Sequence, residues 1–118
     1  MNIQLIYNKN NKEIKERLEI LKKYIKEECN EYCIKFFERQ NEKNVIDIYL
    51  IISNDFEEIK QYEEKIKEKK KIAILTNNLD TIHILNCINI SKTISYLESQ
   101  PKNIVEKIIL KYYKEKKQ

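Results

Sequence analysis

The chain has 118 residues, of which 42% are hydrophobic and 36% are charged, and its net charge is +4 at neutral pH. This length predicts a single domain over residues 1–118, with one hydrophobic core. No apolar run approaches the ~20 residues that a membrane-spanning helix needs, and no signal-peptide pattern is visible, so we expect a cytoplasmic protein. The chain lacks glycine, which excludes glycine-rich phosphate loops of the Walker and Rossmann types.

Basic residues are concentrated in two blocks, Lys67–Lys71 and Lys111–Lys117. Lysines are favoured at the carboxyl end of a helix by the helix dipole, so the simplest interpretation is two solvated helix ends. A nucleic-acid-binding protein is an alternative interpretation. It predicts a single basic face and an affinity that falls steeply with salt.

Three cysteines and a single histidine raise the question of a zinc site. Cys29 and Cys33, together with His83 and Cys87, supply ligand types that zinc accepts, but neither pair has the two-residue spacing of common zinc knuckles. An odd number of cysteines without an export signal predicts reduced thiols. We therefore expect neither a metal site nor a cofactor.

The first half of the chain predicts a strand, a helix and a second strand. Ile3–Tyr7 has the pattern of a strand, and Lys12–Glu28 has apolar residues at helical spacing. Tyr32–Phe37 is ambiguous: its aromatic and β-branched content favours a buried strand that includes Cys33, although the same residues could line one side of a helix. Only seven residues, Glu38–Asn44, separate this segment from the next strand. The second crossover helix is therefore expected to be shortened or missing, unless this segment departs from a parallel plan.

The stretch Val45–Asp55 contains the longest apolar run of the chain, Ile48–Ile52. Such a run suits a strand that is buried on both faces, as in a parallel sheet between two layers of helices. Asp55 and Glu58 have the form of a capping box that opens a helix reaching to about Lys70. The apolar stripe of this helix is formed by Phe56, Ile59, Tyr62 and Ile66.

The second half continues the alternation. Lys71–Thr76 and Thr93–Leu97 predict two more strands, and Leu79–Ile88 predicts a short helix between them. A last helix is expected from Pro101 to about Lys114. The apolar side of the short helix is expected to carry Ile82, Leu85 and Ile88. The alternation predicts an α/β fold, with a five-stranded, mostly parallel sheet and helices on both faces.

This order of elements resembles the receiver domain of bacterial response regulators, a flavodoxin-like module, over the whole chain. The resemblance is strongest to receivers of the LytTR class. In these, a strand that ends in Thr and a polar turn leads into an aliphatic helix, as in Ile74–Ile82 here, followed by a strand like Ile94–Leu97 and a helix that begins with proline. The resemblance implies the same fold and a role in signalling.

A working receiver holds Mg²⁺ with an acidic pair after its first strand and accepts a phosphoryl group on an aspartate at the end of its third strand. A hydroxyl after the fourth strand and a lysine after the fifth bind the phosphate. At the matching positions this chain mostly lacks that chemistry. The resemblance implies a degenerate phosphorylation pocket that consists of Asn8, Lys9, Ile52, Ser53, Thr76 and Ser99, with Tyr96 as the switch-like aromatic residue.

Asp55 is the alternative phosphoryl acceptor. It lies beyond the end of the central strand, where the cap of the next helix is its more natural role. If Asp55 were the acceptor, the chain would be a phosphorylatable receiver. No acidic pair for Mg²⁺ follows the first strand in either case, since Tyr7, Asn8 and Lys9 contain no carboxylate.

The resemblance implies a phosphorylation-independent regulatory or protein-interaction module in bacterial signalling or transcription control. An enzyme would need a base or a nucleophile at the strand ends, and Asn8, Ser53, Asn54 and Thr76 offer only hydrogen bonds. Receivers bind partners through their fourth helix, fifth strand and fifth helix. We expect a protein partner or a homodimer to contact the corresponding surface of this chain through Asp80, His83, Asn86, Lys107, Lys111 and Tyr113.

Overall fold

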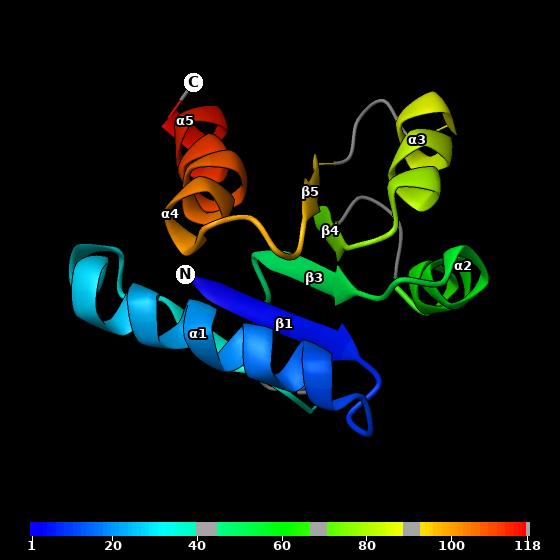
Figure 1. Ribbon diagram of the computed structural model, residues 1–118. Coiled ribbons are helices and arrows are strands. Elements are labelled where there is room, and N and C mark those ends of the chain that lie inside the picture. The colour runs from blue at the N-terminus through cyan, green and yellow to red at the C-terminus, as the bar shows by residue number, and fades with distance from the viewer. Residues whose placement is uncertain (40–44, 67–70, 89–92, 118) are drawn as a thin grey trace.

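The structure is a computed structural model that describes residues 1–39, 45–66, 71–88 and 93–117 (Figure 1). Strands and helices alternate along it. In chain order the elements are β1 (Asn2–Tyr7), α1 (Lys12–Glu28), the short 3-10 helix η1 (Asn30–Tyr32), β2 (Lys35–Phe37), β3 (Ile48–Ile52), α2 (Phe56–Glu64), β4 (Ile72–Thr76), α3 (Leu79–Ile88), β5 (Thr93–Tyr96), α4 (Pro101–Ile104), the π-helical η2 (Val105–Leu110) and α5 (Lys111–Lys117).

The five strands form one parallel sheet in the order β2-β1-β3-β4-β5. This is the strand order of flavodoxin-like folds. β3 lies at the centre, where Ile52 is opposite Tyr7 of β1 on one side and Leu75 of β4 on the other. The prediction of an α/β fold with a parallel sheet is confirmed.

Helices cover both faces of the sheet (Figure 1). Because successive side chains of a strand point to opposite faces, β3 contributes to two separate cores. Ile48, Leu50 and Ile52 pack with α1 and the last helix, whereas Ile51 packs with α2 and α3. This double burial explains the continuous apolar run of the central strand. Within the described part of the chain, no helix has the length and apolar composition to cross a membrane.

The segment Tyr32–Phe37 differs from its prediction. Only Lys35–Phe37 is a strand, and it pairs parallel to β1. Cys33 has left-handed backbone angles (φ 49°, ψ 49°) and an exposed side chain, so it does not lie in a buried strand. The reason is the preceding η1 turn, in which the Cys33 N–H donates to the Asn30 carbonyl. Pairing between this segment and β1 therefore begins only at Lys35, whose N–H donates to the Met1 carbonyl. The described residues between β2 and β3 contain no helix, in line with a shortened or missing crossover; 40–44 lie outside them.

The start of α2 keeps the predicted cap but not the capping box. Asp55 Oδ1 accepts a hydrogen bond from the Glu57 N–H at 2.9 Å. The Asp55 N–H, which Glu58 would bind in a capping box, donates instead to Ser53 Oγ at 3.1 Å. The helix ends at Glu64, earlier than the predicted Lys70, and residues 67–70 lie outside the described part.

The last helix extends further than predicted and changes its winding. It continues to Lys117, and its middle section, Val105–Leu110, is π-helical. Beyond this wider turn two tyrosines contact other elements: the Tyr112 hydroxyl donates to Asp47 Oδ1 at 3.2 Å, and the Tyr113 hydroxyl donates to the Tyr32 carbonyl at 3.0 Å.

A partly buried hydrogen-bond triad, whose central Glu38 is exposed, joins the end of β1 to α1 and to the segment after β2. The Tyr7 hydroxyl donates to Glu38 Oε1 at 2.8 Å, and Lys22 Nζ donates to the same oxygen at 2.8 Å. Burial and the Glu38 carboxylate raise the pKa of Tyr7 from 10.0 to about 12. The lysine and the tyrosine hydrogen bonds lower the pKa of Glu38. The triad is therefore stable with a neutral phenol and a charged carboxylate.

This triad predicts a loss of stability in alkaline solution. Folding favours the neutral phenol of Tyr7, so its contribution is fully present below pH 10 and is lost as the pH rises towards about 12. Tyr7→Phe should remove this part of the pH dependence, which urea denaturation across that range measures. Other tyrosines also have raised pKa values, so the informative quantity is the difference between the two proteins. Parallel losses of stability in wild type and variant would contradict the assignment to Tyr7.

Candidate functional site

The carboxyl edge of the sheet is the candidate site, because ligands of parallel α/β folds bind where the strands end. In this chain the edge is lined by amides and hydroxyls. Asn54 follows β3, and Thr76 and Asn77 form the end of β4 and the turn after it. Among the described residues no group of three or more histidine, cysteine or acidic side chains could hold a metal ion.

Asn54 is the centre of the hydrogen bonds at this edge. Its Oδ1 accepts from the Asn77 N–H at 2.7 Å and from Thr76 Oγ1 at 3.4 Å. Its backbone carbonyl accepts from Thr81 Oγ1 at 3.4 Å. Asn54 therefore ties the end of β3 to the end of β4 and to α3.

Asn77 and Asn78 extend this network to the neighbouring elements. Asn77 Oδ1 accepts from the Glu98 N–H at 2.9 Å, next to the end of β5. Asn78 Oδ1 accepts from the N–H groups of Asp80 and Thr81 at 3.0 and 3.2 Å and so caps α3. The Asn78 N–H donates to Thr76 Oγ1 at 3.2 Å. The Thr76 hydroxyl thus both donates and accepts within the protein.

The structure places Ile52, the expected acceptor position, in the core and Asn54 at the polar edge of the sheet. Ile52 is 0% exposed and packs in the core on the α1 side of the sheet. The side chain that lies beside Thr76 is that of Asn54, two residues later. The sequence contained a usable signal, because the polar residues Ser53-Asn54-Asp55 mark where the strand leaves the core.

The other members of the predicted pocket have hydrogen-bond partners or surroundings of their own. Asn8 Oδ1 accepts from the Asn10 N–H within its own turn, and Lys9 is exposed. The Ser99 N–H donates to the Tyr96 carbonyl, which forms a turn after β5. In the described part of the chain, no hydrogen bond joins Asn8, Lys9 or Ser99 to Asn54. Ser53 is buried and binds the Asp55 N–H, and Tyr96 is half-buried.

The four potential zinc ligands lie on two distant elements. Cys29 and Cys33 follow the carboxyl end of α1, whereas His83 and Cys87 lie on α3. Figure 1 shows these two elements at opposite ends of the molecule. These residues cannot ligate one ion together. Burial, with acidic neighbours, raises the pKa of the Cys29 thiol and makes it a weak nucleophile.

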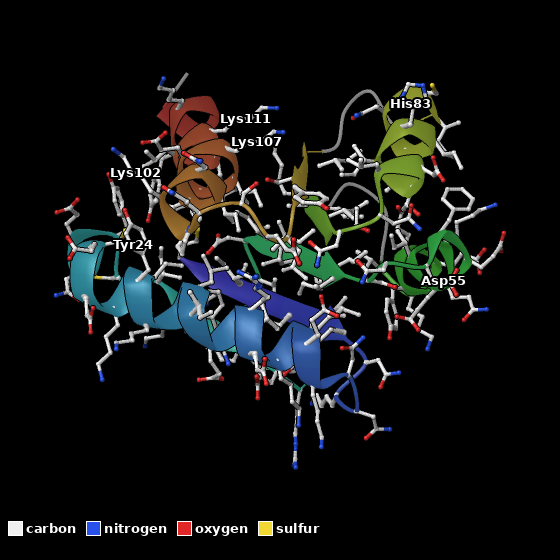
Figure 2. The ribbon with its side chains drawn as sticks, in the orientation of Figure 1. Tyr24, Asp55, His83, Lys102, Lys107 and Lys111 are labelled. Carbon is white, nitrogen blue, oxygen red and sulfur yellow. The ribbon has the colours of Figure 1, made fainter. Side chains whose placement is uncertain are left out.

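Most residues of the predicted interaction surface are exposed. Asp80, His83 and Asn86 are exposed on α3, and Lys107 and Lys111 are exposed on the last helix. Figure 2 shows His83 on α3, and Lys107 and Lys111 on the last helix. The sixth residue, Tyr113, is half-buried. Its ring lies 5.3 Å from that of Tyr32, and its hydroxyl is bound to the Tyr32 carbonyl, so its contacts are internal.

The sequence did not reveal that α3 also exposes apolar side chains. Leu79 is 70% exposed, Ile84 44% and Ile88 58%. Ile88 was predicted on the buried side, but Thr81 and Leu85, one helical turn apart, are the residues that face the sheet. Thr81 takes this place because its hydroxyl binds the Asn54 carbonyl.

Comparisons with known proteins do not assign the chain to a family. No family model matches it. No curated protein and no solved structure matches it either.

Proposed function

We propose that this chain is a degenerate receiver-like module that regulates by protein contact and without phosphorylation, in bacterial signalling or transcription control. The observation that supports the proposal is that the polar side chains at the carboxyl edge of the sheet are hydrogen-bonded to one another. Asn54 replaces a carboxylate beside Thr76, and its oxygen already accepts hydrogen bonds from Asn77 and Thr76. A neutral amide is a poor nucleophile toward a phosphoryl group, so this position has lost the chemistry of an acceptor.

The interaction surface in this proposal consists of α3, the edge strand β5 and the last helix, and we call it the α3–β5 surface. β5 has a neighbour on only one side, and α3 exposes Leu79 and Ile84. Asp80 on α3 and Lys107 on the last helix give the surface one acidic and one basic part. In a twofold dimer the acidic part of one copy can face the basic part of the second copy. We therefore propose self-association through this surface.

The proposal includes a cytoplasmic location, which fits three cysteines without a disulfide. It also treats the chain as non-catalytic. Nucleic-acid binding is the weaker alternative. Figure 2 shows Lys107 and Lys111 on one side of the last helix and Lys102 on the other, so these three lysines do not form one basic stripe. The block Lys67–Lys71 lies outside the described residues except for Lys71.

Incubation with acetyl phosphate and Mg²⁺ tests the phosphorylation-independent role. We expect no phosphoryl adduct in the intact mass, because Thr76 forms its side-chain hydrogen bonds within the described residues with Asn54 and Asn78 and with no carboxylate. An active receiver domain treated in parallel verifies the reagent. Asp55 is the competing acceptor, although its Oδ1 is engaged as the cap of α2. A phosphoryl adduct that forms on the wild type and is lost in Asp55→Asn would contradict the proposal and identify a phosphorylatable receiver.

A further inference from the structure

Three side chains with metal-binding or carboxylate groups lie on one exposed side of α3, namely Asp80, His83 and Cys87. An α-helix has 3.6 residues per turn, so the three lie within about 60° of one another around the helix axis. Figure 2 shows the His83 side chain pointing away from the rest of the molecule. In the described part of the chain, no hydrogen bond or ion pair engages any of the three side chains. Their donor atoms are therefore available to a ligand from solution.

His83 and Cys87 are one helical turn apart, which is the spacing of two zinc ligands on a helix. Side chains four residues apart start from Cβ atoms about 5–6 Å from each other. Zinc bonds to an imidazole nitrogen at about 2.0–2.1 Å and to a thiolate at about 2.3 Å, so one ion can reach both side chains. Zinc proteases use the same spacing for two histidines of one helix. The two-residue spacing of zinc knuckles, which this pair lacks, belongs to ligands on a tight turn.

Asp80 supplies a carboxylate one turn before His83, since residues three apart on a helix are neighbours. The cap of α3 holds Asp80 in the first turn, where its N–H donates to Asn78 Oδ1 at 3.0 Å. Histidines that bind zinc commonly donate their second ring N–H to a carboxylate, which orients the ring and makes it a better ligand. Asp80 is placed for this role.

We propose that His83 and Cys87 bind a zinc ion on α3, with the Asp80 carboxylate orienting the imidazole. The Cys87 thiol loses its proton to the solvent on binding, and thiolate and imidazole occupy two of the four tetrahedral positions. These ligands suit zinc, whereas Mg²⁺ and Ca²⁺ prefer oxygen. The other two positions take water or a ligand of a bound partner, since no group of three such side chains could hold a metal ion among the described residues. One chain suffices for this site, so its failure would leave the proposed function standing.

Titration with Zn²⁺ against a chromophoric chelator, in the presence of a phosphine reductant, measures this binding. We expect one zinc ion per chain with a dissociation constant of about 1–100 µM, because the chain supplies half of the ligands of a closed site. His83→Ala should weaken binding about tenfold or more, and Asp80→Asn about tenfold. The three side chains are exposed, so the variants should keep the wild-type fold, which circular dichroism verifies.

Co²⁺ is the spectroscopic probe of the thiolate, because a sulfur ligand gives this ion an intense charge-transfer absorption. Cys87→Ser should lose the absorption. Cys33→Ser is the matched control and should keep it, since Cys33 is also exposed but follows α1 at the other end of the molecule. Absence of zinc binding by the wild type up to about 1 mM would overturn the proposal. Thiolate absorption that survives in Cys87→Ser, or unchanged zinc affinity in His83→Ala, would also overturn it.

Discussion

Replacing Ile52 with aspartate should strongly destabilise the domain at neutral pH. Ile52 is 0% exposed and surrounded by the core on the α1 side of the sheet. A carboxylate there loses its hydration without gaining a partner, and we expect a loss of about 4 kcal/mol or more, against a total stability of about 5–15 kcal/mol. Burial favours the neutral carboxyl, so the loss should diminish as the pH falls. Urea denaturation followed by circular dichroism measures both effects.

Asn54→Asp is the matched control, because it adds the same carboxylate two residues further along the chain. Asn54 lies at the carboxyl edge, and its oxygen already accepts from the Asn77 N–H and the Thr76 hydroxyl. A carboxylate can accept the same hydrogen bonds, so we expect this variant to fold with a stability within about 1 kcal/mol of the wild type. Equal stability of the two variants would contradict the placement of the strand end between Ile52 and Asn54.

The alternation of elements was predictable because each helix and strand carries its own local signal. The helix Lys12–Glu28 was predicted with the bounds that the structure has, since Asn11 caps it and its apolar residues keep helical spacing. The central strand Ile48–Ile52 was also predicted correctly, because burial on both faces requires a continuous apolar run. Such signals depend only on residues that are close to one another in the sequence, so they can be recognised without the structure.

The errors concern features that depend on residues distant in the chain. The strand after α1 begins at Lys35, whose N–H donates to the Met1 carbonyl. No pattern in the neighbouring residues indicates this start. Leu85 and Ile82 lie on the buried side of α3 as predicted, but Ile88 is exposed. Thr81 also faces the sheet, because its hydroxyl binds the Asn54 carbonyl. That Asn54 and not Ile52 lies beside Thr76 depends on the pairing of β3 with β4.

Self-association should be lost when charges are placed on the exposed apolar side chains of α3. Leu79 and Ile84 are 70% and 44% exposed, and burial of such side chains in an interface stabilises it by about 1.5–3 kcal/mol each. The double variant Leu79→Glu and Ile84→Glu would bury two charges instead. We expect its association constant to fall well over tenfold, since 1.4 kcal/mol corresponds to a factor of ten.

A matched control uses the two exposed apolar residues of the described chain that lie outside α3. Ile20 on α1 is 49% exposed, and Val45 before β3 is 77% exposed. Substituting both by glutamate changes the net charge and the exposed apolar area in the same way. It leaves the α3–β5 surface untouched, so the association constant of this control should match that of the wild type.

Sedimentation velocity over a concentration series, without any phosphoryl donor, is the most direct test of a phosphorylation-independent contact module. We expect the wild type and the Ile20→Glu, Val45→Glu control to shift from monomer to dimer with rising concentration, and the Leu79→Glu, Ile84→Glu variant to stay monomeric. A wild type that is monomeric throughout, or two double variants that weaken association equally, would contradict the account.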